Sequence, residues 1–414
     1  MIILLSMAIL FPLFYTPWFG DYYNYPKSLL LTALSLAALI HILLKFRSIE
    51  LHRLKKLPGK FLLAGFILFI IISTLFSPYE DDVFFGTFTR HTGFYFYIST
   101  FILFLYSYLI LTHNKIMILL KAFVFTSIPI SIYGILLSYG VWPQFYENQV
   151  FFYGYRSSST IGNPNFLGTY LYLMFVLGCY LYFKYRRWFY LFSIFIVYAC
   201  ILTSQTRSAW LSSLIIFICI IIVNWKNGGY WRSLSNWSLY MGLFTVSLII
   251  FFTNPQFSER LYTSTIEALQ EDQKDPGQFG SSRGIIWENS IKTFQNSSIK
   301  ELLFGTGPDT FYKRVYFSPE EKETYFNTTE IEVDKAHNIF LETLLTLGIP
   351  AFLCLYLLYS RFISFNNNSI STYLSLLLIG YLIQGFFNID VVSVYPIFII
   401  LLSILAYCKS YAIE

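Results

Sequence analysis

The sequence predicts an all-α polytopic membrane protein with about twelve transmembrane helices. Of its 414 residues, 56% are hydrophobic and only 12% are charged, and the mean hydropathy is +0.57. Soluble domains carry about 25% charged residues, so a chain with half that share cannot cover a water-facing surface. The composition therefore excludes a soluble enzyme, a disordered chain and a nucleic-acid-binding domain. The five cysteines lie inside apolar runs without CxxC spacing, which favours packing roles for all of them.

Apolar runs long enough to cross a bilayer recur along the chain, because a hydrocarbon core of about 30 Å requires roughly 20 apolar residues per helix. The first run lacks a basic leader and a small-residue cleavage site, so we expect an uncleaved helix rather than a signal peptide. The runs divide the chain into residues 1–253 with nine spans, a long loop at 254–336, and residues 337–414 with three spans. The expected spans are residues 2–19, 27–46, 61–77, 94–112, 116–138, 165–183, 188–205, 208–224, 238–253, 338–359, 371–387 and 391–408.

The distribution of Lys and Arg predicts that both termini are cytoplasmic. With the N-terminus inside, the cytoplasmic segments hold fifteen Lys and Arg residues. The short outer loops then hold only four, Lys27, Arg90, Arg156 and Arg207. Positive charge concentrates on the cytoplasmic side of membrane proteins, and long loops are exempt from this rule. The long loop is therefore expected to be extracytoplasmic.

The long loop has the composition of folded, water-exposed chain, with fourteen acidic residues against nine basic ones. Ser258 and Ser282 are candidate N-caps for two helices within it. The second of these helices carries Trp287, Ile291 and Phe294 at helical spacing. We therefore expect a partly helical segment that lies over the membrane surface.

Polar clusters gather at the predicted outer ends of the spans. Residues 86–93 include Arg90, residues 156–165 include Arg156, Asn163 and Asn165, and residues 206–208 include Arg207. Arg283 begins a loop helix, and His337 and Asn338 open the tenth span. Chance would scatter such residues over both faces, so this convergence predicts a functional site on the outer side.

These residue types suit chemistry on a phosphorylated substrate. The planar guanidinium of arginine donates two parallel hydrogen bonds to phosphate and keeps its charge. Several arginines facing one cavity could hold a diphosphate and stabilise it as a leaving group. His337 could take a proton from an attacking hydroxyl, and Glu342 lies five residues further on. No dense cluster of metal-ligating residues stands out, so no metal or other cofactor is expected.

Each feature also has a simpler interpretation. A single arginine at a helix end often reaches toward lipid headgroups, although outer-face arginines are disfavoured by the orientation rule. Residues 162–165 (Gly-Asn-Pro-Asn) could form only a turn and a helix start. A lone histidine at the entrance of a span is more often a hydrogen-bonded interface residue than a catalyst. Residues 305–308 (Gly-Thr-Gly-Pro) lack a βαβ context, so no nucleotide role is assigned to them.

The ordered set of motifs resembles the O-antigen ligase and O-antigen polymerase superfamily of bacterial membrane glycosyltransferases. The matching segments extend over the chain from about residue 60 onward, and the long loop comes just before the histidine segment, as in that family. They are GTFTRHTG at 86–93, STIGNPNFLGTYL at 159–171, SQTRSAWL at 204–211, SRGIIW at 282–287, LFGTGPDTF at 303–311 and AHNIFLETLLTLG at 336–348.

The resemblance implies a helical bundle of the GT-C-like, lipid-linked-sugar glycosyltransferase type in the bacterial cytoplasmic membrane. It implies a metal-independent transfer of a glycan from undecaprenyl diphosphate to a hydroxyl of a glycan or lipid acceptor. Arg207 and Arg283 would grip the diphosphate, and His337 would act at the acceptor hydroxyl. Arg90, Arg156, Asn163, Asn165 and Asn338 are further candidate substrate-binding residues.

Three functions remain open on the sequence. Ligation of a finished glycan and polymerisation of repeat units share these motifs, so the sequence does not separate them. A lipid-linked oligosaccharide transporter is the alternative from another class. Transporters place polar residues near the bilayer midplane, whereas here the unusual residues gather at one end of the spans.

Overall fold

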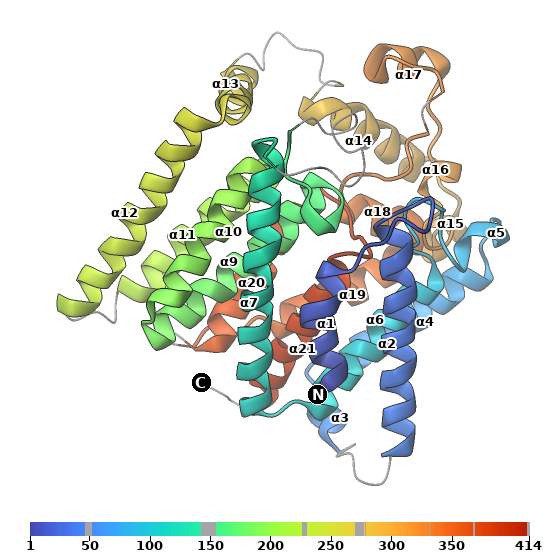
Figure 1. Ribbon diagram of the computed structural model, residues 1–414. Helices are drawn as coiled ribbons and strands as arrows, with labels where there is room; N and C mark the ends of the chain where they lie inside the picture. Colours follow the sequence, from blue (N-terminus) through green and yellow to red (C-terminus); the bar gives the residue numbers. More distant parts are fainter. Residues whose placement is uncertain are drawn as a thin grey trace.

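The computed structural model describes residues 1–45, 52–141, 155–225, 230–269, 277, 279–330, 332–366 and 369–411, and in these residues all regular structure is helical (Figure 1). Five helices are long and apolar enough to cross a membrane, and seven shorter apolar helices accompany them. These findings confirm the all-helical, polytopic class. The apolar helices are α1 (Ile2–Leu13), α2 (Asn24–Leu44), α4 (Lys60–Leu75), α6 (Phe94–Ile110), α7 (His113–Ser138), α9 (Pro164–Tyr185), α10 (Trp188–Thr203), α11 (Arg207–Trp225), α12 (Tyr230–Thr253), α19 (Ile349–Phe362), α20 (Ile370–Gly385) and α21 (Tyr395–Tyr411).

Three expected spans differ clearly from the observed helices. The helix that corresponds to the span expected at 238–253, α12, already begins at Tyr230. The span expected at 2–19 ends as a helix at Leu13. The span expected at 338–359 is two helices, α18 (Ile339–Leu347) and α19, because the chain breaks at Gly348. Gly348 has φ +85, and a Cβ there would lie 2.5 Å from the carbonyl oxygen of Leu303. Hydropathy alone does not register such a break, since the residues on both sides are apolar.

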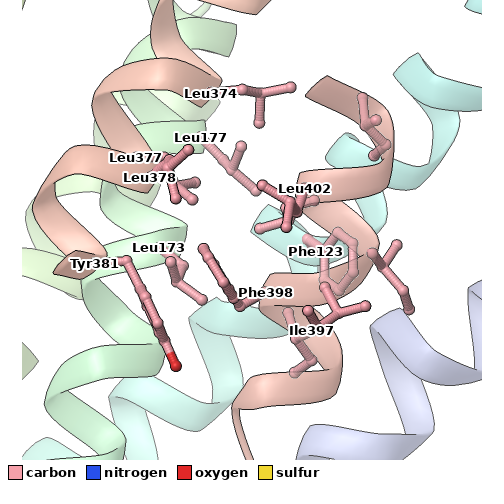
Figure 2. Packing of buried hydrophobic residues seen from close by; sticks show 14 of the residues in the cluster. Phe123, Leu173, Leu177, Leu374, Leu377, Leu378, Tyr381, Ile397, Phe398 and Leu402 are labelled. Carbon is pink, nitrogen blue, oxygen red and sulfur yellow. The ribbon is translucent and has the colours of Figure 1, made fainter. Parts of the chain in front are cut away.

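The centre of the bundle is formed by α9, α20 and α21, whose side chains are buried on nearly all sides. In a membrane protein an apolar helix can face either lipid or other helices, so it is the burial of these three helices that identifies them as the interior ones. Figure 2 shows Leu173 and Leu177 of α9 packed against leucines of α20 and α21. Tyr381 of α20 stacks on Phe398 of α21, with ring centroids 3.8 Å apart. Helices α2, α11 and α12 lie further out and expose much of their apolar surface.

Figure 1 shows the N-terminus and α3 (Arg53–Lys56) at one end of the bundle, and most of the Lys and Arg residues outside 254–336 lie in segments at this end. There Lys409 at the end of α21 donates to the carbonyl oxygen of Arg361 at 2.6 Å. Arg53 of the short helix α3 donates to the carbonyl oxygen of Leu111 at 2.8 Å. The segments between α12 and α19 cover the opposite end of the bundle.

The segment expected as a long loop is a small helical layer. Its buried apolar cluster includes Ile285, Phe311 and Val333, and it extends to Leu345 of α18. Two of its helices begin with complete capping boxes, at Ser298 and Ser318. The layer consists of α13 (Pro255–Leu269), α14 (Phe279–Gln295), α15 (Ile299–Phe304), α16 (Phe311–Arg314) and α17 (Pro319–Phe326); α5 (Glu80–Val83) and the 3₁₀ turn η1 (Ser159–Ile161) lie at the same end.

The two predicted N-caps in this layer are wrong. Helix α13 begins earlier than expected, and the Asn254 side chain accepts the N–H of Phe257 at 3.0 Å, so Asn254 rather than Ser258 caps it. Ser282 lies inside α14 and donates to the carbonyl oxygen of Tyr325 at 2.7 Å. Serine can bond to nearby backbone in several ways, so its presence before an apolar periodicity did not fix the helix start.

Candidate active site

The polar segments singled out in the sequence contact one another at the covered end of the bundle. Helix starts and loops far apart in the chain are joined there by hydrogen bonds and ring contacts, so they form one site region. The linking contacts are Thr87 N to Asp309 Oδ2 (2.7 Å), the Arg90 guanidinium over the Phe166 ring (5.7 Å), Arg156 Nη2 to Asn165 Oδ1 (3.0 Å) and Trp287 Nε1 to the Ala336 carbonyl oxygen (3.2 Å).

A buried ion-pair network ties three of these segments together. Lys335 and Asp309 are 4% and 2% exposed, and Lys335 Nζ lies 2.6 Å from Asp309 Oδ1 and 3.0 Å from Glu342 Oε1. The other carboxylate oxygen of Asp309 accepts the backbone N–H groups of Thr87 and Thr92 at 2.7 and 3.2 Å. Burial alone would lower the pKa of Lys335, but the charges of Asp309 and Glu342 raise it. Lys335 therefore stays charged and fixes the positions of the three segments relative to one another.

Arg90 forms a second ion pair beside this network. Its Nε and Nη2 donate to the two carboxylate oxygens of Asp334 at 2.6 and 3.3 Å. Burial alone would raise the pKa of Asp334, but Arg90 holds it below its usual value. The guanidinium fork of Arg90 is thus engaged by a protein carboxylate, so its observed role is to position residue 334, three residues before His337.

Arg156 organises the turn that precedes Arg207. It donates to the carbonyl oxygen of Ser204 at 3.2 Å and to Asn165 Oδ1 at 3.0 Å. The Asn163 side chain caps α9 by accepting the N–H of Asn165 at 2.8 Å. These three residues, predicted to bind substrate, therefore have structural partners that place Arg207 at the first position of α11.

His337 lies in a short segment whose neighbours are all fixed. The Ala336 N–H donates to Glu342 Oε2 at 2.9 Å, and the Ala336 carbonyl oxygen accepts from Trp287. On the other side, the Asn338 side chain caps α18 by accepting two of its backbone N–H groups. His337 itself has φ +49, in the left-handed region that non-glycine residues rarely adopt. A backbone conformation of this kind persists only where contacts with the surrounding residues hold it in place, and it is often found at functional sites.

The electrostatic surroundings keep His337 neutral. Burial, followed by the positive charges of Arg283 and Arg90, lowers the pKa of the imidazole to about 3. Asp334 opposes this shift but does not outweigh it. A neutral imidazole can accept a proton, whereas a protonated one cannot, so the site holds His337 in the form that a general base requires.

The positive charges of arginines from three helices act on one another, and one of the three, Arg283, also acts on His337. Burial and the positive charges of Arg207 and Arg260 lower the pKa of Arg283. The Nε atoms of all three arginines are shielded from solvent. Positive charges that are partly shielded from water repel one another, and a bound anion would reduce the repulsion among these guanidinium groups.

The glycine-rich segment at 305–307 supports α18 rather than a nucleotide. The carbonyl oxygen of Thr346, near the end of α18, accepts the N–H groups of Thr306 and Gly307 at 3.1 and 2.8 Å. It also accepts the hydroxyl of Ser73 at 3.0 Å. Gly305 has φ +66, and a Cβ there would lie 2.2 Å from the same oxygen. The glycines allow this close backbone approach, and with it the C-terminus of α18 is capped.

The sequence reasoning did not identify Asp309, Asp334, Lys335 or Arg260. Asp309, Asp334 and Lys335 lie in a segment rich in charged residues, whose composition indicates exposure to solvent. No sequence pattern distinguishes these buried charges from the exposed ones. Arg260 lies three residues after Phe257, and this spacing is the one signal that could have placed it on the inner face of α13.

In the part of the chain that the structure describes, no group of three or more His, Cys, Asp or Glu side chains is arranged to hold a metal ion. Residues 190–356 match the family model described as O-antigen ligase. These residues run from α10 to α19 and include Arg207, Arg260, Arg283 and His337. Neither the curated proteins nor the solved structures include a match to the chain.

Proposed function

We propose that the chain, whose residues 190–356 match the O-antigen ligase family model, transfers a glycan from undecaprenyl diphosphate to an acceptor hydroxyl as a member of the O-antigen ligase and polymerase superfamily. The feature that carries the proposal is Arg283, whose charge acts on His337 and on Arg207 at the start of α11. The arginines suit a diphosphate, and the imidazole suits the proton of an alcohol.

In the proposed binding step, Arg207 and Arg283 hold the diphosphate of the lipid-linked donor. Arg207 is the first residue of α11, so the positive end of that helix dipole adds to the positive field. A bound diphosphate would offset the charge that disfavours protonation of His337. Donor binding would therefore raise the proton affinity of the base, because it places negative charge near Arg283.

In the proposed transfer step, the acceptor oxygen attacks the anomeric carbon of the donor glycan. The bond between that carbon and the diphosphate oxygen breaks, and the bond to the acceptor oxygen forms. His337 accepts the proton of the acceptor hydroxyl, and undecaprenyl diphosphate leaves with the bonding electron pair. The arginines stabilise the charge that develops on the leaving group.

The test uses purified protein, a synthetic undecaprenyl diphosphate glycan and an acceptor, with a chelator present. We expect His337→Gln to abolish transfer while donor binding persists, because glutamine can replace one hydrogen bond of histidine but cannot serve as the base. Replacing Arg207 or Arg283 by Lys should cost roughly 2–4 kcal/mol of transition-state stabilisation. Full activity in His337→Gln would exclude the base assignment, and near-normal turnover in both Lys variants would exclude the clamp. Sensitivity to the chelator would point to a metal mechanism instead.

The same assay separates the two members of the superfamily. A ligase attaches one preformed glycan to a lipid or other acceptor, whereas a polymerase extends one lipid-linked glycan with another. We propose ligation, with polymerisation as the alternative, and the product length with a single repeat unit as donor decides between them.

We also propose that the site lies on the extracytoplasmic side of the cytoplasmic membrane. Outside residues 254–336, most Lys and Arg residues fall in the short segments on the side of the bundle that holds the N-terminus and α3, away from α14 and α18 (Figure 1), as expected for a cytoplasmic face. A cysteine in place of Lys322 on α17 should react with an impermeant thiol reagent added outside whole cells. A cysteine in place of Lys55 should not, and the reverse pattern would refute this orientation.

A further inference from the structure

We propose that Arg260, on α13, is a third arginine of the diphosphate site and contacts the donor together with Arg207 and Arg283. This inference rests on the proposed function and extends it to a residue that neither the sequence motifs nor the family match assigns. The ligand class is a diphosphate monoester or diester, as found at the head of a polyprenyl-linked glycan.

The inner face of α13 carries Arg260. Phe257 is buried, Arg260 and Ser264 are half-buried, and the residues between them, such as Leu261 and Tyr262, are exposed. The spacing of three and seven residues places Phe257, Arg260 and Ser264 on one side of a helix. Arg260 therefore points toward the bundle and not away from it into solvent.

Ring packing fixes where this face of α13 lies. The rings of Phe257 and Trp210 meet edge to face with centroids 5.1 Å apart, and Phe257 also joins the buried cluster of Leu202 and Ile250. Trp210 donates its indole N–H to the carbonyl oxygen of Ile201 at 3.0 Å, which holds the ring at the end of α10. The first turn of α13 is thus anchored where α10, α11 and α12 meet.

This anchor brings together α11 and α13, each of which carries one arginine near the contact. Arg207 precedes Trp210 by three residues on α11, and Arg260 follows Phe257 by three residues on α13. Each arginine is therefore one turn away from the ring that makes the contact, on the same side of its helix. The charge of Arg260 also reaches Arg283 on α14. Three helices thus contribute one guanidinium each to a common region.

The chemistry of the ligand explains why three cations would act together. Each non-bridging oxygen of a diphosphate can accept more than one hydrogen bond, so a third guanidinium still finds acceptors after two have paired bidentately. Its positive charge would also stabilise the negative charge that develops on the leaving diphosphate. An arginine of similar exposure could instead serve anionic lipid headgroups. Both ligands carry phosphate, so the experiment has to distinguish a diphosphate in the site from a headgroup at the membrane surface.

The experiment measures the binding of inorganic pyrophosphate to the purified full-length protein in detergent without added anionic lipid, by calorimetry. We expect Arg260→Gln to weaken pyrophosphate binding about tenfold to hundredfold, the range of one charge-assisted hydrogen-bonding group. Arg260→Lys should lose less, since it keeps the charge. Lys292→Gln is the matched control, because Lys292 is a highly exposed cation of the same helical layer, and its affinity should stay within about twofold of the wild-type value.

Four results would overturn the inference. Unchanged pyrophosphate affinity in folded Arg260→Gln, with loss in Arg207→Lys and Arg283→Lys, would remove Arg260 from the site and leave the proposed function standing. An effect of Arg260→Gln that appears only in nanodiscs with anionic lipid, and not in detergent, would assign Arg260 to headgroups. If the wild-type protein neither binds pyrophosphate nor transfers glycan, the proposed function falls and this inference with it. If Arg260→Gln does not fold, the test uses Arg260→Lys instead. An affinity of Arg260→Lys equal to that of the wild-type protein, for both pyrophosphate and the donor, would refute the contact.

Discussion

Asp309→Asn should destabilise the protein far more than removal of a surface carboxylate. Asp309 is 2% exposed and lies 2.6 Å from Lys335 Nζ. Removing one partner of a buried ion pair costs about 3–5 kcal/mol, because the other charge is left uncompensated. Here Glu342 remains 3.0 Å from Lys335, and an Asn oxygen can still accept the N–H groups of residues 87 and 92. We therefore expect a loss near 3 kcal/mol in the free energy of unfolding, at the lower end of that range.

The matched control is Asp82→Asn. Asp82 also pairs with a lysine, Lys313, at 2.5 Å, but the two side chains are 22% and 29% exposed. Exposed pairs contribute about 0–1 kcal/mol. Both variants are measured by unfolding of the purified protein in a titration with sodium dodecyl sulfate, followed by tryptophan fluorescence. If Asp309→Asn costs no more than Asp82→Asn, the buried network does not hold the loops as argued.

Two further predictions concern pH and the glycine-rich segment. The pKa of His337 is lowered to about 3 from its usual 6.5. We therefore expect the pH profile of kcat/KM to show no histidine inflection between pH 5 and 7. An inflection near pH 6.5 would contradict this prediction. The same shift makes the unfolded chain bind a proton that the folded chain does not, so the contribution of His337 to stability should fall as the pH drops below 6.5, as measured by denaturation at several pH values. Gly305→Ala should lower the free energy of unfolding by about 2 kcal/mol or more, because the new methyl group combines a positive φ with a clash against Thr346. The control is Gly20→Ala, which should cost less than about 1 kcal/mol because the nearest atom is 3.6 Å away. Equal costs of the two substitutions would show that the close approach at Gly305 is not needed.

Much of the fold could be predicted from the sequence, because long apolar runs have few alternatives to helices in a membrane. The runs at 165–183 and 188–205 correspond closely to α9 and α10. The break at Gly348 could not be predicted, because it depends on the approach of Leu303 from a distant part of the chain.

The candidate site divides in the same way. Arg207, Arg283 and His337 carry recognisable motifs, so sequence reasoning could single them out. Lys335 and Asp309 could not be singled out, because what distinguishes them from other loop charges is burial, and burial depends on tertiary packing. The same limit applies to Arg90, whose motif indicated an anion site but did not show that Asp334 already occupies its guanidinium fork.

The break at Gly348 also determines how deep the covering layer sits in the bilayer. Helix α19 has 14 residues and so rises about 21 Å from the basic end to the break, whereas the hydrocarbon core is about 30 Å thick. If the basic end marks one boundary of that core, residues 305–307, which bond to Thr346 just before the break, lie below the opposite boundary. A segment whose composition indicates exposure to water would then be re-entrant. Backbone carbonyls at such depth need protein donors because no water is available, and the three donors on the Thr346 oxygen meet that need.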